Sequence, residues 1–140
     1  MSLMNSEPKH RLLAVDDNLD SAELIARVAA KCGYEAQTMA DPRALVDLIT
    51  AWRPDILTLD LCMPQEDGVH LLSLLSASGF KGQLVIISGQ DSWMRKVARR
   101  LAEARGLKVA EDLGKPVDIK ELRQLLTALK PELKVSPTAA

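Results

Sequence analysis

Cysteine and aromatic residues are scarce in this chain of 140 residues. Cys32 and Cys62 are its two cysteines, and neither has a second pair beside it. This argues against a disulfide framework and a zinc site, and favours reduced thiols in a cytoplasmic protein. Two tryptophans, one tyrosine and one phenylalanine imply an aliphatic core and supply little stacking surface for single-stranded nucleic acid.

Long hydrophobic runs and an excess of charge are also missing. No apolar stretch approaches the roughly 18 residues of a membrane span, and we expect no signal peptide. The net charge of −1 exerts no overall attraction toward DNA or a membrane surface. What is present is an ordinary globular balance, 47% hydrophobic and 26% charged, in a length that suits one domain.

Short apolar runs alternate with helical patterns along the chain. Five strands are predicted: Leu12–Val15, Tyr34–Met39, Ile56–Leu59, Leu84–Ile87 and Leu107–Ala110. Apolar residues recur every three to four positions in five predicted helices: Asp20–Cys32, Pro42–Trp52, Val69–Ala77, Trp93–Ala104 and Ile119–Leu129. The strongest strands are apolar throughout, as strands buried on both faces are. The alternation predicts an α/β fold, a doubly wound five-stranded parallel sheet with five helices.

Capping residues mark the helix boundaries. We expect Asp41-Pro42 to begin the second helix and Gly33 to end the first. Ser92 is the expected cap of the fourth helix, and its inward stripe is expected to contain Trp93, Val97, Leu101 and Ala104.

Polar side chains stand at the carboxyl ends of four predicted strands. They are Asp16 and Asp17 after the first strand, Asp60 after the third, Ser88 after the fourth and Lys115 after the fifth. In an open parallel sheet these ends lie along one edge, and ligands bind there at the point where the strand order reverses. With the first strand central, three carboxylates should meet at that point.

Carboxylates in contact need a cation. Each pair at about 4 Å costs on the order of 4 kcal/mol at an effective dielectric constant near 20. Mg²⁺ accepts oxygen ligands and commonly sits on one or two carboxylates plus a phosphate, so it relieves this repulsion better than protonation does. An aspartate can then attack phosphorus and form an aspartyl phosphate, while Ser88 and Lys115 donate to the other phosphoryl oxygens.

In combination, these residues resemble the receiver domain of two-component response regulators. The resemblance runs from about Arg11 to Lys130 and implies a flavodoxin-like sheet in the order 2-1-3-4-5. It is carried by the acidic pair Asp16-Asp17, the block Asp60–Gly68 (Asp-Leu-Cys-Met-Pro-Gln-Glu-Asp-Gly), Ser88-Gly89 and Lys115-Pro116.

The resemblance also implies a role for each site residue. Asp60 would accept a phosphoryl group from the phosphohistidine of a histidine kinase or phosphotransfer protein. Asp17, Asp60 and the backbone carbonyl of Cys62 would bind Mg²⁺ directly, and Asp16 would help through water. Ser88 would be the switch hydroxyl, and Lys115 would pair with the phosphate. The chain would be a signalling switch for an output domain or partner protein, not an enzyme, with no nucleic-acid or membrane contact.

Two rival functions stay open. Taken singly, Asp16 and Asp17 suit helix capping, Asp60 a turn and Lys115 a solvated surface. An aspartate-nucleophile phosphatase on a similar sheet is one alternative, although such enzymes favour acids two residues apart after the first strand. A receiver used only for docking is the other.

Two regions depart from the receiver pattern or add to it. Asp112 stands three residues before Lys115-Pro116, where receivers usually carry Tyr or Phe, so rotation of an aromatic side chain is unavailable as part of the switch. The run Leu107–Pro116 resembles receivers attached to cyclic-di-GMP phosphodiesterase domains of the EAL type. The fourth helix carries a basic face, which suits a solvated surface or a site of partner binding or homodimerisation with the fifth strand and helix: Arg95, Lys96, Arg99, Arg100 and Arg105.

The expected domain organisation is simple. Residues 1–10 would be a disordered or expression-derived N-terminus, 11–130 the receiver domain, and 131–140 a C-terminal tail or the start of a linker. An output domain would lie beyond Ala140 or be another protein.

Overall fold

A five-stranded parallel sheet forms the centre of the molecule, in a computed structural model that describes residues 9–61, 68–89 and 91–130. The strands are β1 (Arg11–Val15), β2 (Glu35–Met39), β3 (Ile56–Leu59), β4 (Gln83–Ser88) and β5 (Lys108–Gly114). The helices are α1 (Leu19–Lys31), a 3₁₀ turn η2 (Pro42–Ala44), α2 (Leu45–Trp52), α3 (Gly68–Ala77), α4 (Ser92–Ala104) and α5 (Ile119–Leu129). All paired strands are parallel, in the order β2-β1-β3-β4-β5. The predicted fold class and strand order are confirmed.

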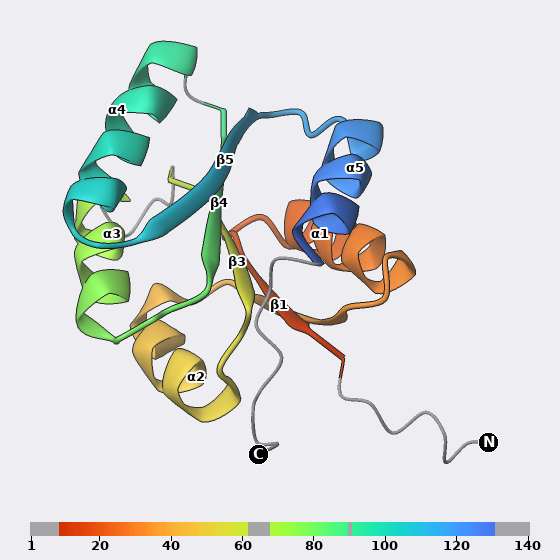
Figure 1. Cartoon of the computed structure of the whole chain (residues 1–140), viewed down its shortest axis with the longest axis horizontal. Coiled ribbons are helices and arrows are strands. Elements are labelled where there is room, and N and C mark those ends of the chain that lie inside the picture. The colour runs from red at the N-terminus through yellow and green to blue at the C-terminus, as the bar shows by residue number, and fades with distance from the viewer. Residues whose placement is uncertain (1–8, 62–67, 90, 131–140) are drawn as a thin grey trace.

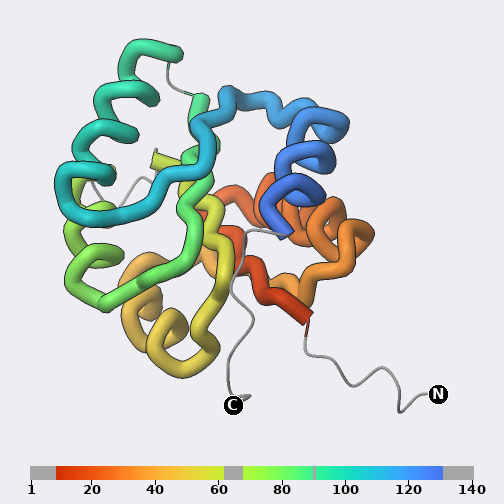
Figure 2. The backbone as a smooth tube through the Cα atoms, viewed as in Figure 1, coloured from red at the N-terminus to blue at the C-terminus, as the bar shows by residue number. Residues whose placement is uncertain are grey.

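The helices form one layer on each face of the sheet. Helices α2, α3 and α4 cover one face, and α1 and α5 lie side by side on the other (Figures 1 and 2). Because successive side chains of a strand point to opposite faces, each central strand feeds two cores. On β4, for example, Ile86 belongs to the α2–α3–α4 core and Ile87 to the α1–α5 core. This is why the central strands had to be apolar throughout.

Local sequence explains most helix boundaries. Asn18 caps α1 by accepting a hydrogen bond from the Ser21 N–H at 3.0 Å, and Asp118 caps α5 in the same way. Gly33, at φ 93°, follows the end of α1 in the left-handed region that glycine tolerates best. Arg53 ends α2 at φ 54° despite its side chain.

Three predictions about the C-terminal half were wrong. Asp91, not Ser92, caps α4, because its carboxylate accepts the Met94 N–H at 2.9 Å. Trp93 is 70% exposed and Ala104 is also exposed, so neither belongs to the inward stripe. Strand β5 continues to Gly114, four residues beyond the predicted end, with a shift of register against β4 between Leu84 and Val85.

In the part of the chain that the structure describes, none of the helices has both the length and the apolar character of a membrane span.

Candidate functional site

The two central strands place their carboxylates side by side. Val15 pairs with Leu59, so the next residues, Asp16 and Asp60, leave β1 and β3 at the same level of the sheet. The Asp60 N–H still donates to the Val15 carbonyl at 3.0 Å, and the Asp16 N–H donates to the Met39 carbonyl at 3.1 Å. The sheet ladder therefore continues through both acids and holds their backbones in place.

Asp16, Asp17, Asp60 and Lys115 make up what we call the acidic crevice. A carboxylate oxygen from each of the three acids lies within 4.8 Å of the other two. The Lys115 ammonium donates to Asp16 Oδ2 at 2.8 Å and to Asp60 Oδ2 at 3.2 Å. Asp16 and Asp60 are only 1% and 5% exposed, whereas Asp17 is exposed. The sequence prediction that these four residues converge is confirmed.

The charges in the acidic crevice do not balance. Three carboxylates face one ammonium, and two of the carboxylates are buried, where repulsion is screened least. Burial works against the charge of Lys115, but its hydrogen bond to Asp16 and the negative charge of Asp60 outweigh that effect and raise the pKa of the lysine. Lys115 is therefore a firmly held cation, and the crevice retains an excess of negative charge.

Backbone contacts place Ser88 and Lys115 at the same edge. Ser88 is the last residue of β4, is fully buried and pairs with Gly114 of β5. The Lys115 N–H donates to the Ser88 carbonyl at 3.1 Å, and a cis peptide bond joins Lys115 to Pro116. The residues that carry a hydroxyl and an ammonium group therefore lie side by side at the carboxyl ends of β4 and β5.

The capping explanation for the acidic pair is wrong. Asn18 caps α1, and Asp16 instead accepts the Asn18 N–H through Oδ1 at 2.9 Å while its Oδ2 binds Lys115. Both oxygens of Asp16 are thereby oriented. Cys62, whose backbone carbonyl was expected to bind Mg²⁺, lies outside the described residues.

A second group of charges joins α4 to β5, and the sequence did not reveal it. We call it the α4–β5 ion cluster; it contains Arg95, Lys96, Arg99, Glu111 and Asp112. Arg99 Nη1 donates to Asp112 Oδ1 at 3.1 Å and to Glu111 Oε1 at 3.2 Å. Burial opposes the charge of Arg99, but the hydrogen bonds that it donates to Asp112 and Glu103 more than offset this effect and raise its pKa.

The solvated interpretation of the basic face on α4 is therefore only half right. Arg100 and Arg105 are exposed, but Arg95 and Arg99 turn toward a carboxylate whose side chain is completely buried. The available signal was Asp112 itself, an acid within a strand, with basic residues one helical turn apart on the preceding helix.

Comparisons of sequence identify the family. A family model described as Response regulator receiver domain matches residues 12–127. The chain is 32% identical over 121 residues to Response regulator MprA of Mycolicibacterium vanbaalenii, covering 85% of this chain and 49% of that protein. It is 33% identical over 128 residues to the Mycobacterium avium protein of the same name, covering 87% of this chain and 53% of that protein. The chain spans about half the length of these relatives.

Comparisons of structure agree. A response regulator from Colwellia psychrerythraea superposes with a TM-score of 0.77 at 29% identity, covering 88% of this chain and 98% of that one. Chemotaxis protein CheY4 of Vibrio cholerae superposes with a TM-score of 0.71 at 23% identity, covering 86% and 98%. The second likeness supports the fold alone.

Proposed function

Because the chain belongs to the response regulator receiver domains of two-component signalling, we propose that Asp60 is its phosphoacceptor. The observation that carries this assignment is the acidic crevice. At the carboxyl edge of the sheet, Asp60 shares the Lys115 ammonium with Asp16 and has carboxylate oxygens of Asp16 and Asp17 within 4.8 Å. The family match favours this role over the phosphatase alternative.

The donor set of the crevice fits Mg²⁺. Three carboxylates supply hard oxygen ligands, and their excess negative charge is what a divalent cation neutralises. We infer that Asp17 and Asp60 bind the ion directly, that Asp16 contributes through water, and that the Cys62 carbonyl completes the protein ligands. When bound, Mg²⁺ supplies positive charge to the phosphoryl oxygens during transfer.

The residues of the chain then have separate tasks in transfer. A carboxylate oxygen of Asp60 attacks phosphorus, the bond from phosphorus to the donor imidazole nitrogen breaks, and the imidazole leaves with its electron pair. Lys115, already held beside Asp60, shifts from the carboxylates to a phosphoryl oxygen. The Ser88 hydroxyl donates to another phosphoryl oxygen and so senses the product.

The wider setting of the domain follows from the same proposal. Its donor would be a histidine kinase or phosphotransfer protein in the cytoplasm, and its target an output domain or a separate protein. We propose the boundaries 11–130 for the receiver, flanked by residues 1–10 and 131–140. An EAL-type output domain and homodimerisation through α4, β5 and α5 stay predictions. We expect no reaction on a separate substrate.

Phosphorylation of Asp60 can be tested directly. The protein is incubated with acetyl phosphate and Mg²⁺, and acid-labile phosphate is measured by gel retardation and intact mass. We expect labelling of the wild type, loss of labelling in Asp60→Asn, and full labelling in the control Asp55→Asn, which changes a carboxylate at the opposite end of β3. Equal labelling of Asp60→Asn would overturn the assignment.

A further inference from the structure

The two arginines of the α4–β5 ion cluster contact Asp112 unequally. Arg99 hydrogen-bonds to Asp112 and Glu111 and is also within 3.5 Å of Glu103 and 3.4 Å of the Val109 carbonyl. Arg95 lies one turn closer to the acidic crevice, and its Nε is 3.6 Å from Asp112 Oδ2, an ion pair without a hydrogen bond. Arg99 therefore anchors the middle of α4, whereas Arg95 can separate from Asp112 at lower cost.

Arg95 also reaches the edge of the candidate site. Its Nη1 lies 3.1 Å from the position that a Cβ on Gly114 would occupy, so the guanidinium fills the space left by this glycine. Gly114 pairs with Ser88 on the neighbouring strand, and strand alternation places both residues and Asp112 on the α4 face of the sheet. Arg95 thus contacts the buried carboxylate of Asp112 and also lies against Gly114, the residue that pairs with Ser88.

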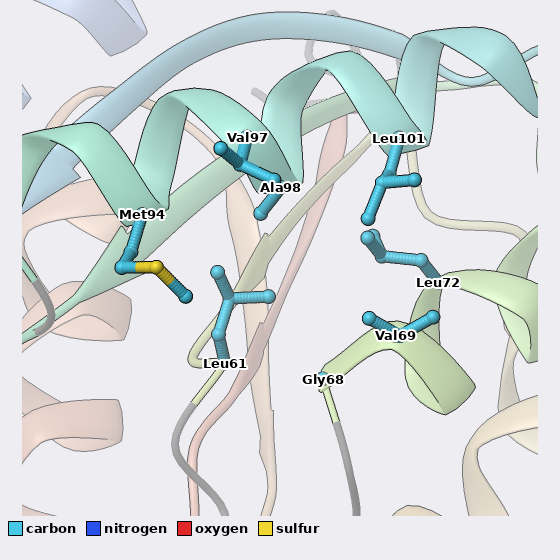
Figure 3. Close-up of a pocket in the computed structure, with 8 residues that line it drawn as sticks. All are labelled: Leu61, Gly68, Val69, Leu72, Met94, Val97, Ala98 and Leu101. Atoms are coloured by element: carbon cyan, nitrogen blue, oxygen red, sulfur yellow. The ribbon is translucent and has the colours of Figure 1, made fainter.

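The first turns of α4 have room to move. Of the thirteen described residues of this helix, only Ala102 is buried, and Trp93 and Met94 are 70% and 40% exposed. A cavity of about 140 Å³ lies between α4 and α3, where Leu101 of α4 faces Leu72 of α3 and Met94 lies beside Leu61 (Figure 3). Few buried contacts and unfilled space beneath a helix are the features of a segment that opens locally.

We propose that Asp112 and Arg95 form the conformational switch of this domain, taking the place of an aromatic side chain. This inference rests on the proposed phosphorylation of Asp60. A change at Ser88 displaces the Arg95 guanidinium from Gly114 and Asp112, and the first half of α4 moves over the cavity while Arg99 stays anchored. Asp112 and Arg95 are positioning residues, since they act through α4 and do not touch the phosphoryl group.

Trp93 offers a local readout of this movement. In a Trp52→Phe background, its fluorescence is followed while the protein is saturated with beryllofluoride and Mg²⁺, and aspartyl phosphate formed from acetyl phosphate is quantified separately. Hydrogen exchange of the α4 amides gives a second readout. The variants are Asp112→Asn and Arg95→Met, and the matched control is Arg100→Met, an exposed arginine of the same helix.

The expected results separate the switch from the phosphoacceptor. Wild type, Asp112→Asn, Arg95→Met and Arg100→Met should all form aspartyl phosphate, and wild type and the control should show the same response of Trp93 and α4. In Asp112→Asn and Arg95→Met, this response should fall by about fivefold or more, the scale of a typical coupling between sites.

Other outcomes identify which assignment fails. An unphosphorylated wild type would contradict the phosphoacceptor assignment. A phosphorylated wild type with an unchanged response in Arg95→Met would overturn the switch. If Asp112→Asn does not fold, Arg95→Met carries the test, because Asp112 keeps its hydrogen bond from Arg99 in that variant.

Discussion

The acidic crevice and the α4–β5 ion cluster are built from the same kinds of residue but differ in charge balance. Both place buried carboxylates at the carboxyl side of the sheet. In the crevice, three carboxylates share one ammonium, whereas in the cluster three cations meet Asp112 and Glu111, and Arg99 also pairs with Glu103, so the charges balance. The crevice therefore carries the excess of negative charge that suits the divalent cation we propose, whereas the charges of the cluster offset one another.

The difference in charge balance gives the two regions different roles. The acidic crevice suits the binding of a ligand, whereas the ion cluster connects α4 to β5. Charges that are unbalanced inside a protein are costly unless a ligand compensates them, and this cost favours the metal binding that we propose for the crevice. In the ion cluster, the balanced charges hold α4 against β5, so a movement of one element affects the other. Opposite responses to neutralising substitutions should distinguish the two regions.

Removing cations from the α4–β5 ion cluster should have the largest effect. The double substitution Arg95→Met and Arg99→Met leaves the buried carboxylate of Asp112 with Lys96 alone among its described ion-pair partners, and we expect unfolding to become about 3 kcal/mol easier. Urea denaturation followed by circular dichroism measures the change. Arg100→Met is the control and should stay within about 0.5 kcal/mol of wild type; a similar loss in both variants would contradict the cluster's role.

Removing the cation of the acidic crevice should cause the next largest loss in the free energy of unfolding. Among these substitutions, it is the only one whose loss a metal ion should reverse. Without Mg²⁺, Lys115→Met should lose about 2 kcal/mol, because Asp16 and Asp60 keep their charges and lose the ammonium that binds both. Millimolar Mg²⁺ should restore most of this loss. Lys120→Met, at an exposed lysine of α5, serves as the control in the same urea titrations. A loss that is indifferent to Mg²⁺ would show that the crevice does not hold the ion.

Neutralising one acid of the crevice should stabilise the metal-free protein. We expect Asp17→Asn to gain about 1 kcal/mol in the absence of Mg²⁺, since it removes repulsion from two carboxylates, and to lose the stabilisation that Mg²⁺ gives wild type. Thermal unfolding with and without the metal measures both effects. Glu23→Gln, on an exposed position of α1, should show neither. If Asp17→Asn is less stable than wild type without Mg²⁺, repulsion among the three carboxylates does not destabilise the folded protein.

Tyr34, a buried and neutral side chain, gives the smallest expected effect on the free energy of unfolding. This effect should depend on pH and not on Mg²⁺. Tyr34 donates its hydroxyl to the Leu126 carbonyl at 2.6 Å, and burial, with the nearby Cys32 and Asp55, raises its pKa well above the usual value. The folded state resists ionisation, so this contribution is fully present below about pH 10 and is lost as the pH rises further. Tyr34→Phe should cost about 1 kcal/mol at pH 7. Its deficit against wild type should shrink in urea titrations at alkaline pH, and a constant deficit would contradict this account.

The acidic crevice could be predicted because it depends on local rules. Apolar runs identify the strands, polar residues directly after them mark the carboxyl ends, and parallel strands bring these ends to one edge. The positions of the strand ends were enough to group four residues, without any knowledge of how helices are rotated: Asp16, Asp17, Asp60 and Lys115. The prediction for the Cys62 carbonyl lies outside the described residues and stays a prediction.

The ion cluster could not be predicted in the same way. Trp93 was expected to face inward and the arginines outward, but the observed rotation of α4 exposes the tryptophan and directs Arg95 and Arg99 to Asp112. That rotation depends on where the Asp91 cap begins the helix. It also depends on β5 continuing past its predicted end to bring Asp112 under α4.

By itself, the sequence determined the alternation of strands and helices, the two helical layers and the gathering of three acids with a lysine, because periodicity and strand ends are properties of neighbouring residues. The strand order was predicted from the resemblance to receiver domains. Only the tertiary structure decided that Asp112, at the position of the usual aromatic residue, is buried and that two arginines of α4 hold it. Such a pairing joins residues on separate elements, so it is set by register, helix rotation and the free energy of burying charge together, none of which a local pattern records.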